Sequence, residues 1–137
     1  MNWKAVIIGS ISYVVLGLLL GNNFKTDEII HLIPYILIFL GSAFIAGLLS
    51  TYISKDKSLK IGFYTGLIGG ILLGIFITLI IFSPDLSRIL FEEKELLRAK
   101  ADIVFFFIMT TMLFTIFGII GSLIGSFVMG RVYKKFK

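Results

Sequence analysis

The 137-residue sequence contains no cysteine, one histidine and two prolines, so it offers no disulfide and no thiolate metal ligand. Charge is also scarce. Only 15% of the residues are Asp, Glu, Lys or Arg, whereas a soluble domain carries roughly 25%. In their place, 58% of the residues are hydrophobic and the mean hydropathy is +1.03. This composition excludes an ordinary soluble domain and indicates an integral membrane protein.

Asp, Glu, Lys, Arg and His are absent from four long apolar runs, which cover residues 5–24, 32–53, 61–82 and 103–130. Proton-coupled transporters and voltage sensors need such groups inside the membrane, so neither class fits. The small multidrug exporters, which also have four spans, are excluded because no run contains a glutamate. Intramembrane proteases need a histidine or paired metal ligands at depth, and these are missing as well. We therefore predict a protein that is not an enzyme and has no cofactor and no metal site.

The four runs predict an all-α integral membrane protein that forms a single four-helix transmembrane domain over residues 1–137. The first run also has the length of a signal peptide, but no small-x-small cleavage site follows its leucine-rich centre, so we interpret it as a retained span. Between the third and fourth runs, the Ser-Pro-Asp sequence at 83–85 has the pattern of a helix start. An apolar stripe at helical spacing follows, so we predict an external amphipathic helix over about residues 84–101.

Basic residues are divided unequally between the two ends of these spans. One end has a single acid, Asp56, and eight basic residues, which are Lys4, Lys55, Lys57, Lys60, Arg131, Lys134, Lys135 and Lys137. The other end mixes five basic with seven acidic residues. The positive-inside rule therefore predicts that both termini are cytoplasmic, in a multi-pass protein of the cell (cytoplasmic) membrane. Because the basic residues lie at the ends of spans, the net charge of +5 does not indicate a nucleic-acid partner.

Small residues recur every four positions in the third and fourth runs. The eight positions are Gly62, Gly66, Gly70 and Gly74 in the third run and Gly118, Ser122, Ser126 and Gly130 in the fourth. Such a row, often called a glycine zipper, gives a helix a groove without side chains, in which another backbone can pack closely. The alternative is that glycine is simply more frequent in membrane helices.

We predict that the two rows form one antiparallel helix contact, with Gly130 opposite Gly62 and Gly118 opposite Gly74. The two helices should be the closest pair, should lie nearest to each other toward their basic ends, and should diverge toward the bulky Phe and Ile residues at the other end. The rows could pack within one chain or between chains. We favour packing within the chain, because a bundle of four spans needs such small-residue faces for its own interior.

Few polar side chains remain within the runs. Tyr13, Ser42, Thr78 and Thr115 lie near mid-membrane and form a candidate polar pocket. The alternative is that each hydroxyl bonds across to another helix, or back to a carbonyl of its own helix.

The chain resembles uncharacterised small four-span membrane proteins that are common in archaeal genomes. The resemblance rests on the opening Met-Asn-Trp-Lys-Ala sequence, the four short spans and the glycine-serine row over residues 118–130, and it covers most of the chain. Those proteins have no assigned activity or functional residues, so the resemblance implies none here. It favours an archaeal cytoplasmic membrane as the location.

Three functions are compatible with these features. The first is a non-enzymatic structural or accessory bundle that docks a membrane-protein partner through its external helix or its basic tail. The alternative is a homo-oligomeric pore or uniporter for a small neutral or hydrophobic solute, lined by glycine backbone and hydroxyls. A holin-like lesion former, suggested by the small size and basic C-terminus, is the third. In each case the lipid bilayer is a partner, and the sequence does not distinguish a partner protein from a homo-oligomer.

Overall fold

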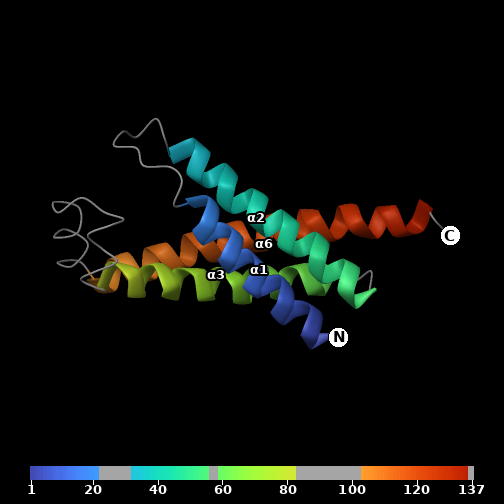
Figure 1. The fold of residues 1–137 in the computed structure, drawn as a ribbon, viewed down its shortest axis with the longest axis horizontal. Helices are drawn as coiled ribbons and strands as arrows, with labels where there is room; N and C mark the ends of the chain where they lie inside the picture. The colour runs from blue at the N-terminus through green and yellow to red at the C-terminus, as the bar shows by residue number, and fades with distance from the viewer. Residues whose placement is uncertain (22–31, 56–58, 83–102, 136–137) are drawn as a thin grey trace.

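The computed structural model describes residues 1–21, 32–55, 59–82 and 103–135 of the chain. In these ranges the fold consists of α1 (Trp3–Gly21), α2 (Leu32–Ser54), α3 (Leu59–Phe82) and α6 (Ile103–Lys135), labelled as in Figure 1. All 4 helices are long and apolar enough to cross a membrane, and the described residues contain no strand. The prediction of four apolar membrane-length helices is therefore confirmed. The amphipathic helix predicted at 84–101 lies outside the described residues.

The helices follow the apolar runs despite their many glycines, because a segment in lipid must satisfy its own backbone hydrogen bonds. Pro34 lies in the first turn of α2, where its missing N–H would have had no intrahelical partner. α2 ends in a left-handed cap at Lys55, which has a φ of 54° and donates its N–H to the carbonyl of Thr51 at 3.1 Å. At the other extreme of the chain, α6 continues past its predicted end at Gly130 to Lys135, since the basic residues that follow are good helix formers.

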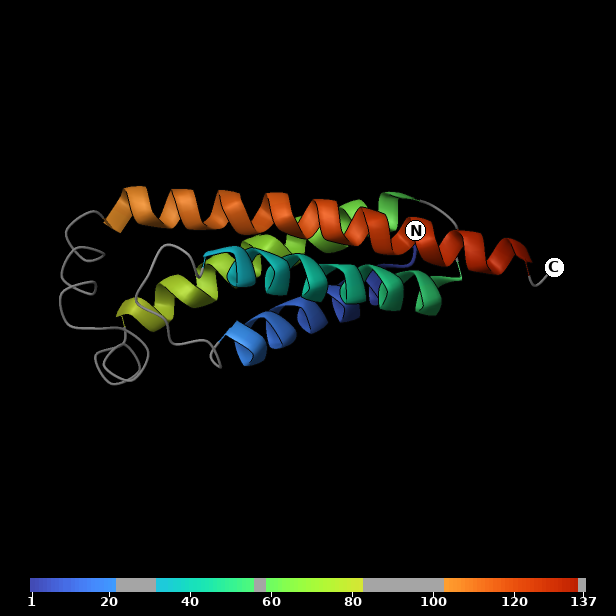
Figure 2. The ribbon, with the colours of Figure 1, turned by 90° about the horizontal axis from the view of Figure 1, so that it is seen from above.

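The bundle has α1 and α6 on opposite sides of a layer formed by α2 and α3 (Figure 2). α6 packs against both α3 and α2, and α1 packs against the same two helices from the other side. α2 and α3 contact each other less extensively across the middle. A side chain that joins α1 to α6 must therefore pass between α2 and α3.

Both chain termini lie at one end of the bundle, as an even number of spans requires (Figure 1). We call this the terminal end. α6 extends beyond the other helices there (Figures 1 and 2), because it has 33 residues whereas α1, α2 and α3 have 19, 23 and 24. At the opposite end, α3 and α6 draw apart (Figure 2), in agreement with the predicted divergence of these two helices.

Candidate functional site

Tyr13 connects α1 to the far side of the bundle. Its side chain is fully buried, and its hydroxyl donates a hydrogen bond to the carbonyl oxygen of Phe114 in α6 at 3.1 Å. Two glycines make room for the ring. A Cβ added at Gly69 of α3 would lie 2.6 Å from Tyr13 Cδ1, and a Cβ added at Gly118 of α6 would lie 2.9 Å from Tyr13 Cε1. The ring therefore occupies a slot whose walls are glycine backbone.

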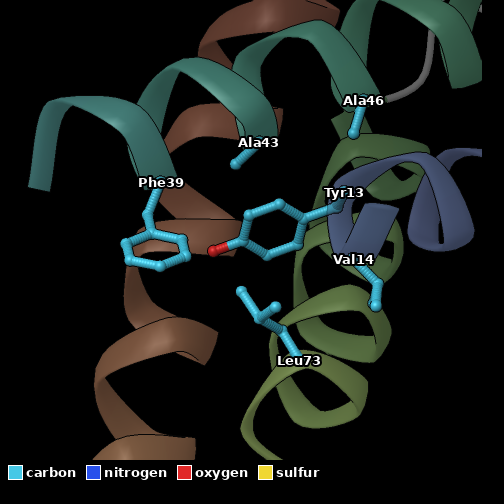
Figure 3. Packing of buried hydrophobic residues seen from close by; sticks show 6 residues of the cluster. All are labelled: Tyr13, Val14, Phe39, Ala43, Ala46 and Leu73. Atoms are coloured by element: carbon cyan, nitrogen blue, oxygen red, sulfur yellow. The ribbon is translucent and has the colours of Figure 1, made fainter. Parts of the chain in front are cut away.

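The surroundings of Tyr13 form the apolar core of the bundle. Figure 3 shows the tyrosine ring between Ala43 of α2 and Leu73 of α3, with the Phe39 ring beyond the hydroxyl. Phe39 in turn contacts the ring of Phe114 edge-on, with the centroids 4.5 Å apart. One aromatic side chain from α1 thus fills the centre of the bundle, where the four helices meet.

α3 and α6 share the most extensive helix contact in the bundle. The backbones touch at Gly66 and Gly118, where a Cβ added to either glycine would overlap the carbonyl oxygen of the other. All four glycines of the α3 row face α6 in this way. The facing residues are Gly62 with Ser122 and Ser126, Gly66 with Gly118, Gly70 with Thr115, and Gly74 with Thr111.

The register of this contact differs from the predicted one. The sequence suggested Gly130 opposite Gly62 and Gly118 opposite Gly74, but Gly118 lies opposite Gly66, and an added Cβ at Gly130 would have nothing within 4 Å. α6 is therefore displaced by about two helical turns toward the terminal end. The predicted register was wrong because it matched the ends of the uncharged runs. α6 is longer than the other spans and extends past them at the terminal end. The end of its apolar run therefore does not lie at the same depth as the ends of the other runs.

α6 uses a second row of glycines against α2. A Cβ added at Gly121 would lie 2.7 Å from the Cβ of Ala43, and one added at Gly125 would overlap the carbonyl oxygen of Phe44. From the α2 side, a Cβ added at Gly47 would overlap the backbone of Ser122. Ser122, which was predicted to face α3, therefore packs against both α3 and α2.

The serines of α6 donate their hydrogen bonds to α2. Ser122 Oγ donates to the carbonyl of Ala43 at 3.0 Å, and Ser126 Oγ donates to the carbonyl of Gly47 at 3.4 Å. Thr51 Oγ1 of α2 donates in return to Ser126 Oγ at 2.8 Å. These bonds fix the rotation of α6 relative to α2, because a hydroxyl on a neighbouring face of α6 could not reach the same carbonyls.

The N-terminal half of α1 is held in the angle between α2 and α3. A Cβ added at Gly9 would lie 2.8 Å from Ser50 Cβ and 2.8 Å from Thr65 Cγ2. The next residue, Ser10, donates its hydroxyl to the carbonyl of Thr65 at 3.1 Å. A glycine contact and a hydrogen bond thus lie side by side here, as they do between α2 and α6.

Six buried hydroxyls gather in the half of the bundle nearer the terminal end, and all four helices contribute. This hydroxyl cluster consists of Ser10, Ser50, Thr51, Thr65, Ser122 and Ser126. Each side chain is at most 3% exposed. Of these six residues, only Ser122 and Ser126 were predicted from the sequence, and they were predicted as helix-packing residues. The sequence did contain a sign of this cluster, because every run has a Ser or Thr within a few turns of its basic end. Residues at equal depth can meet in a bundle, whichever direction each span runs.

The four residues of the candidate polar pocket are placed as follows. Tyr13 donates to α6, whereas Ser42 and Thr78 donate to carbonyls three and four residues earlier in their own helices, at 3.0 and 2.8 Å. Thr115 faces Gly70 with its backbone. Three of the four hydroxyls therefore bond in the manner of the alternative interpretation, across helices or within one. In this arrangement each of these three hydroxyls is itself satisfied by a backbone carbonyl.

Two buried hydroxyl oxygens have no hydrogen-bond partner within the described part of the chain, Thr65 Oγ1 and Thr111 Oγ1. A buried polar atom without a partner costs about 1–3 kcal/mol, whereas a satisfied interhelical bond in a membrane contributes about 0.6 kcal/mol on average. Thr65 belongs to the hydroxyl cluster and is 0% exposed. Ser10 donates to the carbonyl of Thr65 and not to its hydroxyl, and the Thr65 side chain faces Gly9 of α1 with its methyl group.

We expect Gly118→Ala to destabilise the bundle by about 2 kcal/mol or more, because the added methyl would meet both the Gly66 carbonyl and the Tyr13 ring. Gly130→Ala is the matched control. It adds the same methyl group to the same helix in open space, so it should be neutral or stabilising by up to about 1 kcal/mol through helix propensity. Unfolding by denaturing detergent in mixed micelles measures both changes. Equal effects of the two substitutions would contradict the close contact at Gly118.

We expect Thr65→Val to leave stability unchanged or raise it, since valine keeps the shape and removes an unpartnered hydroxyl. Thr51→Val makes the same change at a hydroxyl that bonds Ser126, so it should lower stability by about 0.5–1.5 kcal/mol. The same unfolding titration compares them. A loss at Thr65 as large as that at Thr51 would mean that the Thr65 hydroxyl has a partner in the membrane-embedded protein.

Comparison with known proteins identifies the chain only at the level of a family. Neither the curated proteins nor the solved structures include a significant match. A model of a family of unknown function, DUF5518, matches residues 3–128, which includes α1, α2, α3 and most of α6. The match covers far more than half of the chain, and the protein therefore belongs to the DUF5518 family.

Proposed function

We propose that the protein is a non-enzymatic structural or accessory component of the cytoplasmic membrane, a bundle whose interior serves packing and whose outer surface serves a partner. The observation that carries this proposal is the filled centre. Tyr13 occupies the point where the helices meet, and its ring is enclosed by Gly69 and Gly118. A solute has no path along the axis of one protomer through a position occupied by a fully buried ring.

The glycine rows support the same proposal. They bring backbones of one chain into contact at Gly66 with Gly118 and at Gly47 with Ser122, so their use within the chain accounts for them. In lipid, where no hydrophobic force drives helices together, such close contacts supply the dispersion attraction that holds a bundle. We propose that the rows act as intramolecular glycine zippers.

α6 offers the surface that an accessory role requires. Only 17% of its membrane-length window is buried, compared with 39% for each of the other spans. Its outward face carries a stripe of exposed apolar side chains at helical spacing, namely Met109, Met112, Ile116 and Ile120. Methionine-containing surfaces adapt to varied partners. The pore alternative would also need this face, because a channel excluded from the protomer's centre would have to form between copies.

Cysteine cross-linking tests the role, because the sequence has no native cysteine. A single cysteine at Ile116, which is 47% exposed on α6, is compared with one at Ile11, which is 52% exposed on α1. The accessory proposal predicts a discrete adduct with a different protein at Ile116, none at Ile11, and a single protomer by native mass spectrometry in mild detergent. A symmetric ring of protomers with self-cross-links at Ile116 would overturn it and favour the pore.

We also propose that both termini are cytoplasmic and that residues 84–101 form an external amphipathic helix. The support comes from the sequence, in which the segments at one end of the spans have eight Lys and Arg and one acid, and in which an apolar stripe lies within 84–101. The resemblance to archaeal four-span proteins supports an archaeal membrane. Cysteines at Ser58 and Glu95 should react with an impermeant reagent from opposite sides of the membrane. Labelling of both from one side would refute this topology.

A further inference from the structure

Each of the four described helices has an exposed basic residue within it or directly after it at the terminal end of the bundle. These five described residues, which we call the basic collar, are Lys4, Lys55, Lys60, Arg131 and Lys134. They come from four separate segments of the chain, so the collar is a property of the assembled bundle rather than of its C-terminal tail. The sequence segments on this side of the predicted spans have a strong positive net charge, with eight basic residues and one acid.

Aromatic side chains mark the depth of the membrane interface beside the collar. Trp3 of α1 packs on Tyr64 of α3 with ring centroids 5.7 Å apart, and Phe63 contacts Tyr64 at 5.6 Å. Trp3 is 53% exposed, and Tyr52 at the end of α2 is 59% exposed. Amphipathic aromatic rings concentrate where acyl chains give way to headgroups. This aromatic level therefore lies at the boundary of the hydrocarbon core.

Contacts between helices place the collar relative to the aromatic level. Ser126 of α6 bonds Thr51, the neighbour of Tyr52, and faces Gly62, the neighbour of Phe63. Arg131 then lies about 7.5 Å farther along α6, at 1.5 Å per residue. The headgroup layer on each side of a bilayer is roughly 5–7 Å thick, so the Arg131 backbone reaches its outer part.

The Arg131 side chain runs back along α6 toward the aromatic level. Its Cζ lies 4.2 Å from the centre of the Phe127 ring, one helical turn nearer to the aromatic level. The guanidinium is thereby held within the headgroup layer, against a ring that is itself 47% exposed. A guanidinium stacked on a ring keeps its N–H donors at its edge, where a phosphate can accept two of them.

We propose that the basic collar binds the phosphate groups of anionic phospholipids in the leaflet that surrounds the terminal end, with Arg131 on its Phe127 platform as a principal contact. A basic residue near the surface of an anionic membrane increases binding by about fivefold. The aromatic level favours lipid over a soluble polyanion, since it places these cations among headgroups. The proposal is independent of whether the protein acts as an accessory bundle or as a pore.

The test uses the full-length protein, purified in mild detergent, with native mass spectrometry to count retained lipids after titration with phosphatidylglycerol or phosphatidylcholine. We expect phosphatidylglycerol to bind at least tenfold more tightly. The double substitution Arg131→Gln and Lys134→Gln should weaken its binding by tenfold or more. Arg131→Lys should fall between, because it keeps the charge and loses the paired donors.

Lys94→Gln with Arg98→Gln is the matched control. It removes the same charge from the segment between α3 and α6, which joins their ends opposite the collar, and should leave phosphatidylglycerol binding within about twofold of the parent. Inorganic phosphate at the same concentration should not displace the lipid. Equal binding of the two lipids, equal effects of the two double variants, or displacement by inorganic phosphate would each overturn the proposal.

Discussion

The contact between the backbones of Gly66 and Gly118 governs the arrangement of the other helices. It brings α3 and α6 so close that no side chain fits between them, and it leaves Gly118 with a second neighbour, the ring of Tyr13. Because α1 and α6 lie on opposite sides of the α2 and α3 layer, Tyr13 is the residue that joins them through the middle. In lipid the helices gain nothing from expelling water, so stability has to come from such close contacts and from interhelical hydrogen bonds.

Hydroxyl side chains supply the specificity that glycine cannot. A glycine row lets two helices approach closely, but it does not fix their register, because each glycine of the row offers the same contact as the next. Ser122 and Ser126 remove that freedom, because each hydroxyl reaches one particular carbonyl of α2, at Ala43 and Gly47. Ser10 does the same between α1 and α3. The hydroxyl cluster thus determines register at the terminal end, whereas the apolar core around Tyr13 fills the centre.

The accessory role and the lipid-binding role that we propose use different surfaces of the bundle. The interior is occupied by packing, so an interaction role has to use the outside, where α6 is the least enclosed span. The overhang of α6 then has two consequences. Its middle exposes an apolar stripe, and its end carries Arg131, which stacks on Phe127 and which we propose lies in the headgroup layer. A helix of 33 residues is about 50 Å long, which exceeds a hydrocarbon core of about 30 Å, so it has to tilt or to protrude from that core.

The sequence alone determined that the chain forms four membrane-length helices, because a long apolar run in lipid must satisfy its own backbone hydrogen bonds. It also indicated that α3 and α6 use small residues, since a groove is a property of one helix. Only the tertiary structure decided the register, which depends on α6 overhanging the bundle and on Tyr13 lying beside Gly118. The sequence also did not show that α6 packs against two helices at once. In the structure Ser122 contacts both Gly62 of α3 and Gly47 of α2. A linear row of residues does not specify which helix lies on each of its sides.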